Sequence, residues 1–441
     1  MDLTGRWRPS LALAARSTKL LAAAGFLTGA AVPELAGFET VPDHPAAELL
    51  PPQLVKGPDF HLVDPVHGDG LMNRFVVDSR FGQFEAYGRV ALGMRIREVA
   101  ALSELDRKSK VGLLTGGVER GVESEVRAAA GVVTNPVGTV AGIPRGVSHL
   151  FHGYAARGQE TVAEVQRNTN PSAGPGAGMH DAAASGERAA KRYAEQYLGV
   201  TGAERAWYRR LGVDPYTDNA VLRNAIRKDA KIEAAGSFGA KFVGLPVIPG
   251  IAITERVQDA IYNEDPATIR ERNRKTLAGY GLSPSEIEQW LNAPALSPTR
   301  QVLLLSTAEA LNGVAGRAEL FRHSLDLTSV AEAQVYLRSV GLLVLAHRDS
   351  PLTQMIPGVR LPAAQRADGQ LVVCGAFEAV YWTEAVAADE EQLRTSLPPQ
   401  AAGRGRELWL GGSISPRARA ALRERGWDLH EVPENAGDAL P

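Results

Sequence analysis

Cysteine is almost absent from this 441-residue chain, which contains only Cys374. A single cysteine excludes an intramolecular disulfide and any zinc site built from several thiolates. In an oxidising compartment the stability of the chain must therefore come from the packing of its core.

An excess of charge of one sign is also missing, because 48 Lys and Arg residues are balanced by 50 Asp and Glu residues. The formal net charge of −2 gives no general attraction to nucleic acid. The sequence contains no Walker A loop and no G-x-G-x-x-G that opens a βαβ unit. We therefore expect no nucleotide or other cofactor and no nucleic-acid partner.

Long apolar runs are missing after the first 32 residues. A membrane-spanning helix needs about 20 apolar residues. The apolar run at 242–254 is broken by two prolines. The apolar run at 335–346 is interrupted by Arg338, so we interpret it as a buried helix of the core and not as a membrane span. No later segment is predicted to span a bilayer.

The N-terminal 35 residues have the charge pattern of an export signal. Basic residues lie ahead of an apolar run at 20–32, namely Arg6, Arg8, Arg16 and Lys19. Positive charge followed by roughly 7–15 apolar residues and then small residues is typical of a secretory signal peptide. A short buried helix and an uncleaved anchor are the alternatives. We predict a signal peptide over 1–35 and export to the periplasm or cell envelope. Peripheral attachment to a membrane is an alternative within this prediction.

Beyond the signal, the spacing of apolar residues predicts a mixed α/β (α+β) fold. Aromatic and β-branched runs at 60–63, 73–79 and 84–88 are separated by turn-like sequences and predict an N-terminal β-meander. Helical spacing then predicts one helix over 90–108 and a second over 118–130.

Changes in composition predict the domain boundaries. Residues 166–187 are rich in Gly, Ala, Ser and Pro and hold almost no large apolar side chain, which is typical of a flexible linker. The linker would separate a first domain over 54–165, ending in a Gly-rich segment, from a helical domain over 188–350. Strand, helix and strand patterns predict a small α/β module over 351–441.

Capping signals support the helical prediction for 188–350. Ser283 and Glu286 have the spacing of a capping box, with proline at the first helical position. Asp265 and Ser297 each precede a proline in the same way. Three helix starts are therefore predicted from local sequence.

Metal-capable side chains lie close together at 61–69, namely His61, Asp64, His67 and Asp69. Histidine and carboxylate ligands suit zinc or iron. Their spacing matches no metal motif, and the nearby Pro65, Gly68 and Gly70 favour a turn in which Asp bonds its own backbone. A turn is the preferred interpretation, and a secreted metal-dependent hydrolase is the alternative.

The segment LGGSIS at 410–415 lies one glycine short of the G-x-S-x-G nucleophile elbow. Only Asp428 and His430 follow it, in one predicted strand, which does not fit the chain order of a catalytic triad on a full sheet. A backbone anion site at the helix start is a second alternative. A simple strand-to-helix connection is preferred, so we assign no catalytic and no metal-binding residue and do not expect an enzyme.

Two Gly-rich segments remain as candidate contact surfaces. Residues four apart lie on one face of a helix. The first segment, within 132–158, combines such glycines with an apolar row: Val137, Gly138, Val140, Gly142, Gly146, Val147 and Phe151. The second repeats the spacing of small residues: Gly236, Ala240 and Gly244. Because each interior glycine costs about 1 kcal/mol relative to alanine, these ridges need an offsetting contact.

Small residues at this spacing allow helix backbones to approach closely. The ridges would pack against other helices, or the first segment would lie on a membrane with Arg145 and Arg157 near the headgroups. An irregular loop is the third alternative. We predict a noncatalytic component that binds a membrane surface or another envelope protein, with the metal-dependent hydrolase and a membrane-active toxin as alternatives.

Four phrases resemble a group of exported proteobacterial proteins to which no function is attached. They are VDSRFGQFEAYG, TNPVGTVAGIPRGVSHLF, GVDPYTDNAVLR and ELWLGGSISPRARAALRERGWDLHE. The resemblance extends over most of the chain after residue 70. It implies an envelope or periplasmic setting and transfers no catalytic residue.

Overall fold

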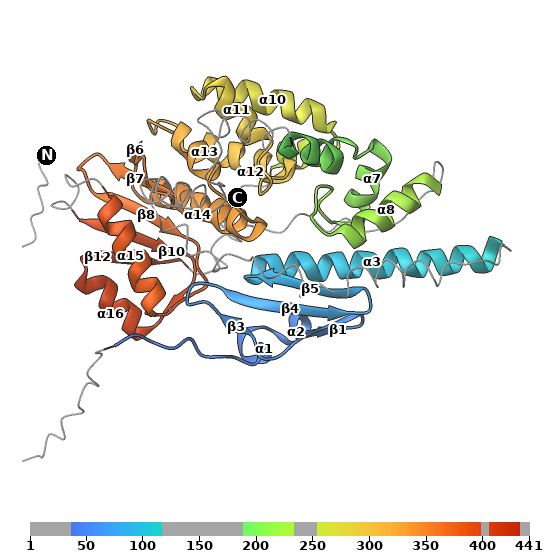
Figure 1. Ribbon diagram of the computed structural model, residues 1–441, viewed down its shortest axis with the longest axis horizontal. Helices are drawn as coiled ribbons and strands as arrows, with labels where there is room; N and C mark the ends of the chain where they lie inside the picture. The colour runs from blue at the N-terminus through green and yellow to red at the C-terminus, as the bar shows by residue number, and fades with distance from the viewer. Residues whose placement is uncertain (1–36, 117–187, 233–253, 398–404, 433–441) are drawn as a thin grey trace, which may run out of the picture. The chain divides into compact units, whose positions relative to one another are not determined.

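The structure is a computed structural model that describes residues 37–116, 188–232, 254–397 and 405–432. Helices lie beside parallel and antiparallel strands in these residues (Figure 1). This arrangement confirms the predicted α+β class.

The first sheet is the predicted β-meander. Its strands are β1 (Lys56–Gly57), β2 (Phe60–Leu62), β3 (His67–Gly68), β4 (Asn73–Ser79) and β5 (Gly82–Tyr87), and they follow two short helices, α1 (Ala46–Leu49) and α2 (Pro52–Val55). Strand β4 pairs antiparallel with β2 and β3 along one edge and with β5 along the other. Phe75 and Val77 of β4 are fully buried and alternate with less buried residues, as expected for a sheet with one covered face.

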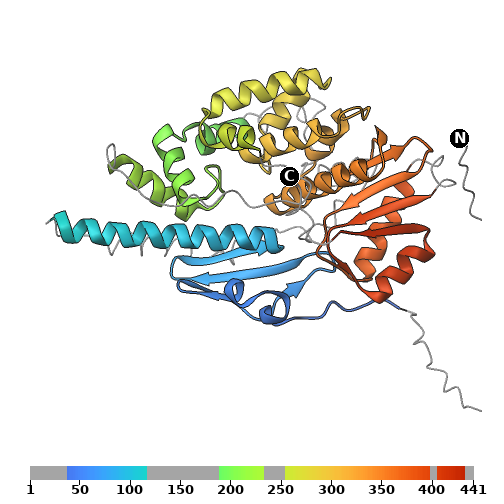
Figure 2. The same cartoon turned by 180° about the vertical axis from the view of Figure 1, so that it is seen from behind.

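Helix α3 (Arg89–Gly116) covers this face and lies along β5 and β4 (Figures 1 and 2). It starts one residue before the predicted helix and continues beyond Lys108. Leu92 and Val99 are buried at the predicted helical spacing. The carboxylate of Glu378, distant in sequence, accepts a hydrogen bond from the backbone N–H of Arg89. A negative group at a helix N-terminus is stabilising, so the C-terminal region fixes the start of α3.

The described part of 188–350 is mainly helical, as predicted. Its elements are the π-helical turn η3 (Ala194–Leu198), α7 (Gly202–Leu211), α8 (Ala220–Ile232), α9 (Glu255–Tyr262), α10 (Pro266–Gly279), α11 (Pro284–Leu291), α12 (Pro298–Glu309), α13 (Ala318–Ser324) and α14 (Val330–Asp349). Asp265, Ser283 and Ser297 accept hydrogen bonds from the first turns of their helices, and Glu286 completes the reciprocal capping box. The three predicted helix starts are confirmed.

The C-terminal sheet forms the predicted α/β module. In sheet order its strands are β12 (Trp427–Glu431), β10 (Arg406–Leu410), β8 (Leu371–Gly375), β7 (Ala363–Arg366) and β6 (Leu352–Met355). The first three strands are parallel, and β7 and β6 are antiparallel. Helix α14 lies on one face, and α15 (Glu384–Ser396) and α16 (Pro416–Glu424) lie on the other (Figures 1 and 2). All five residues of β8 are buried because helices cover both faces.

The LGGSIS segment connects a strand to a helix, as the sequence analysis favours. The short strand β11 (Ser413–Ile414) pairs in parallel with β9 (Ala379–Val380), and Ser415 caps α16. Gly412 lies so close to the backbone of 377–378 that a Cβ atom would overlap its carbonyl oxygens. The hydroxyl of Ser415 donates a 2.6 Å hydrogen bond to the carboxylate of Glu39, so this serine holds the start of the chain's described part.

Some predictions fall outside the described residues. They are the signal peptide over 1–35, the helix over 118–130, the linker over 166–187 and both Gly-rich segments. The described residues from Phe38 onward belong to one compact unit. The predicted domain boundaries stay predictions. None of the helices that the structure describes has the length and apolar character needed to cross a membrane.

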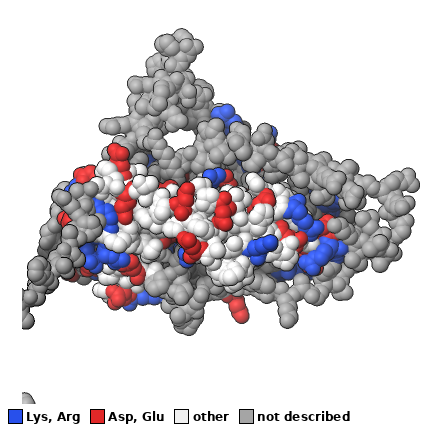
Figure 3. Space-filling view, turned by 90° about the horizontal axis from the view of Figure 1, so that it is seen from below, with Lys and Arg blue, Asp and Glu red and all other residues white. Residues whose placement is uncertain are grey.

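Charge on the described surface is mixed. The view from below shows acidic and basic side chains interspersed over the same face (Figure 3). This agrees with the net charge of −2. Recognition of a charged ligand must therefore come from a local cluster of side chains and not from the field of the whole molecule.

Candidate ligand-binding site

The structure separates the two histidines of the 61–69 cluster. His61 Nε2 lies 3.6 Å from Asp78 Oδ2, and His67 Nδ1 lies 2.7 Å from Asp43 Oδ1. Both histidines are exposed and pair with aspartates outside the predicted cluster. In the described part of the chain, no group of three or more His, Cys, Asp and Glu side chains is arranged to hold a metal ion.

The aspartates of the cluster bind backbone groups. Asp64 Oδ1 accepts a 2.6 Å hydrogen bond from the N–H of Ala46. Asp69 Oδ1 accepts hydrogen bonds of 2.9 and 2.8 Å from the N–H groups of Leu71 and Met72. An aspartate that bonds the backbone two and three residues ahead is typical of a turn. The preferred turn interpretation is confirmed at Asp69.

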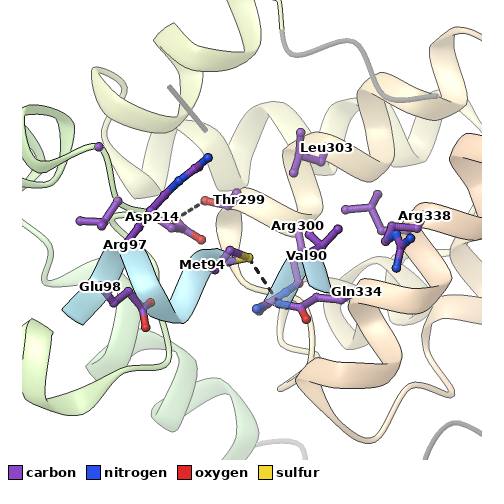
Figure 4. Close-up of a pocket in the computed structure, with 13 residues that line it drawn as sticks. Val90, Met94, Arg97, Glu98, Asp214, Thr299, Arg300, Leu303, Gln334 and Arg338 are labelled. Carbon is purple, nitrogen blue, oxygen red and sulfur yellow. Dashed lines mark hydrogen bonds between the residues drawn. The ribbon is translucent and has the colours of Figure 1, made fainter. Parts of the chain in front are cut away.

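A cavity of about 60 Å³ lies where four distant segments meet: α3, the loop after α7, the start of α12 and the middle of α14 (Figure 4). Much of its wall is apolar and consists of Val90, Met94, Val213, Leu303 and Leu337. Apolar walls with a few convergent polar groups are typical of sites for small molecules.

Three arginines line this cavity, and their side chains point in different directions (Figure 4). They are Arg97 of α3, Arg300 of α12 and Arg338 of α14. Arg300 and Arg338 are only 6% and 5% exposed. Burial lowers the pKa of Arg97. Guanidinium groups pair well with carboxylates, so three arginines in one cavity wall favour a ligand with a negative charge.

One carboxylate of the wall, Glu98, is satisfied by neighbours outside the cavity. Its oxygens accept hydrogen bonds from Arg95 at 2.8 Å, from Asn219 at 3.0 Å and from the hydroxyl of Thr217. Arg95 also pairs with Asp218 at 2.9 Å. The carboxylate of Glu98 is therefore held by side chains that do not line the cavity.

The second carboxyl group of the wall is Asp214. Its Oδ1 accepts hydrogen bonds from the N–H of Tyr216 at 2.9 Å and from the hydroxyl of Thr299 at 2.5 Å. Burial raises the pKa of Asp214. The three arginines of the wall outnumber its two acidic side chains, Glu98 and Asp214.

An outer cleft of about 230 Å³ adjoins the cavity and shares Met94 and Gln334 with it. Gln334 Nε2 lies 3.7 Å from Met94 Sδ (Figure 4). Tyr87 and Ser329 are among the residues that line the cleft. The contact between Met94 and Gln334 therefore borders both the cleft and the cavity.

The sequence analysis did not find this site, because its residues come from segments that are far apart in the chain: 90–98, 212–214, 299–303 and 334–338. One signal was present. Arg338 interrupts an apolar run that was predicted to be a buried helix, and a buried arginine needs a reason. The position of Arg338 in the sequence did not indicate which other residues line the same cavity.

No protein-family model, no curated protein and no solved structure matches this chain. The resemblance to exported proteobacterial proteins therefore stays a prediction, and the site is interpreted from its geometry and chemistry.

Proposed function

We propose that this protein is a noncatalytic binding protein that holds a small carboxylate with an apolar body in the cavity between α3, α12 and α14. The observation that carries the proposal is that three arginines, two of them buried and one half-buried, line one largely apolar cavity. A guanidinium group matches the two oxygens of a carboxylate, and the pairing is strengthened where water is excluded.

The volume of the cavity sets the size of the ligand. A water molecule needs about 10–15 Å³ on this measure. The cavity of about 60 Å³ therefore has room for about four to six water-sized groups, which corresponds to an acid of about two to four carbon atoms. A longer chain would displace Met94 and extend into the outer cleft.

Calorimetric titration of the full chain with acetate, propionate and butyrate, and with the corresponding neutral amides, tests this proposal. We expect the carboxylates to bind and the amides to bind about tenfold more weakly or not at all, because an amide carries no charge. Arg300→Met should weaken carboxylate binding by about tenfold. Leu303→Phe should abolish binding by filling the cavity.

Arg107→Met provides the matched control on α3. The side chain of Arg107 is exposed and pairs with Glu104 at 2.9 Å, outside the cavity. This variant should bind the carboxylates as the natural chain does. Equal binding of acids and amides, or binding that survives both Arg300→Met and Leu303→Phe, contradicts the proposal, as does no binding at millimolar carboxylate to a folded protein.

The predicted setting completes the proposal: an exported protein of the periplasm or envelope whose Gly-rich segments contact a membrane surface or another envelope protein. The glycine spacing at Gly138, Gly142 and Gly146 supports this part. Flotation of the full chain with liposomes should be lost when these three glycines are replaced with leucine. Unchanged flotation and localisation of that variant would exclude a role for the ridge.

A further inference from the structure

A large groove lies between α7 and α9, away from the cavity, with a volume of about 1150 Å³. Arginines line both of its walls: Arg205, Arg209 and Arg210 of α7, and Arg256 of α9. Two acidic residues, Glu255 and Asp259, also line it. The amide of Asn263 donates a hydrogen bond to Asp259, and the four arginines outnumber the two acidic residues.

The buried arginine of this groove, Arg205, has an incomplete set of partners. Its side chain is 7% exposed, and NH1 donates a 2.7 Å hydrogen bond to the carbonyl oxygen of Val200. Its Nε is buried and has no hydrogen-bond partner. A buried donor without a partner is costly, and an anion in the groove would compensate the positive charge.

The positions of the arginines also favour an anion. Arg205 and Arg209 are four residues apart, so they lie on the same face of α7, where like charges destabilise a helix. Arg209 NH1 donates a 3.0 Å hydrogen bond to Asn263 Oδ1, which joins the C-terminal ends of α7 and α9. The groove extends along both helices, from Gly202 and Glu255 at their first residues to Arg210 and Asn263 at their ends.

We infer that this groove, formed by α7 and α9, is a second ligand site that binds phosphoryl groups. A phosphoryl group offers three strong acceptor oxygens and close to two negative charges, so it satisfies several guanidinium groups at once. The groove is much larger than the carboxylate cavity, which suits a ligand with more than one phosphate or a phosphate on a larger body.

Titration of the full chain at low salt with pyrophosphate and with inorganic phosphate tests this inference. We expect pyrophosphate to bind more tightly than phosphate, and both to weaken as salt rises, because screening reduces the attraction. The double variant Arg209→Gln, Arg256→Gln should weaken pyrophosphate binding by about tenfold or more. Both side chains lie toward the surface, so the variant should fold.

Arg274→Gln is the matched control. Arg274 lies on α10, outside the groove, and pairs with Glu288 at 2.6 Å and with Glu271 at 2.7 Å. This variant should bind pyrophosphate as the natural chain does. Arg300→Met should also leave pyrophosphate binding unchanged, so the groove and the carboxylate cavity are tested independently.

A second arm distinguishes the sources of the phosphoryl group. Flotation is measured with vesicles of phosphatidylcholine alone and with vesicles that also contain phosphatidylglycerol. Binding to the anionic vesicles that the double variant loses assigns a lipid headgroup; pyrophosphate binding without vesicle binding assigns a free phosphate ligand. Both results support the inference. No binding of either phosphate or of anionic vesicles, or binding that is equal in the double variant, overturns it.

Discussion

The C-terminal module and the helical region both bury charged side chains, but they do so in different ways. In the module, Arg366 donates hydrogen bonds of 2.9 and 2.7 Å to the two oxygens of Glu407, and its NH1 donates to the carbonyl oxygen of Ala346 at 3.2 Å. Trp409 Nε1 adds a 2.7 Å hydrogen bond to Glu407. Arg366 is 6% exposed and Glu407 is 5% exposed, and each charge is paired with hydrogen-bond partners.

In the helical region, Arg300 is as deeply buried as Arg366. The hydrogen bond of its guanidinium to Ala295 is 3.5 Å long, and a cavity lies beside it. Two arginines that are equally buried therefore differ in how many strong partners surround them. The bidentate pair joins β7 to β10 and is structural, whereas Arg300 lines the cavity in which we propose that a carboxylate binds.

The largest expected effect comes from the structural pair. Arg366→Met leaves the charge of Glu407 buried without its partner, so we expect the free energy of unfolding to fall by about 3–5 kcal/mol. Chemical denaturation measures this loss. Arg366→Met combined with Glu407→Leu removes both charges and should recover most of the stability. A loss below about 1 kcal/mol in the single variant would contradict the structural role.

A smaller loss is expected at the cavity. Arg300→Met removes one long hydrogen bond and the attraction of Arg300 for Asp214 but breaks no bidentate pair, so the free energy of unfolding without ligand should fall by about 1 kcal/mol. The same denaturation experiment measures it. If this variant were destabilised as strongly as Arg366→Met, the two buried arginines would have the same role and the comparison would fail.

The smallest expected effect is a difference in pH dependence. Burial raises the pKa of Asp214, so the stability that this group contributes is complete below its unfolded pKa of 3.8 and is lost as pH rises through its folded pKa. Asp214→Asn keeps both hydrogen bonds to Oδ1 and removes the titration. Unfolding curves between about pH 3 and 7 should show the variant gaining stability relative to the natural chain as pH rises.

Glu407 is a control whose pKa shifts in the opposite direction. Its pKa is lowered, because hydrogen bonds from Arg366 and Trp409 outweigh the effect of burial. The stability from Glu407 is therefore present above its unfolded pKa of 4.5 and is lost as pH falls. An Asp214→Asn variant with the same slope as the natural chain across this range would show that Asp214 is not titrating as the geometry indicates.

The candidate site shows where prediction from sequence stops. Arg338 was visible as a charge within an apolar helix, and α14 is buried as predicted. Arg97, Arg300 and Asp214 gave no signal, because an arginine or aspartate in a helix or turn is normally on the surface. Only the packing of α3 against the helical region brings them to one cavity.

The sequence by itself determined the elements whose causes are local. The capping box at Ser283 and Glu286, the alternating strand at 73–79 and the turn at Asp69 depend on side chains within a few residues of each other, so the chain specifies them before it folds. The tertiary structure decided the rest. The cap that Glu378 places on α3, the closed Arg366–Glu407 pair and the open cavity at Arg300 all depend on which distant segments pack together, and that is set by the burial of the common core.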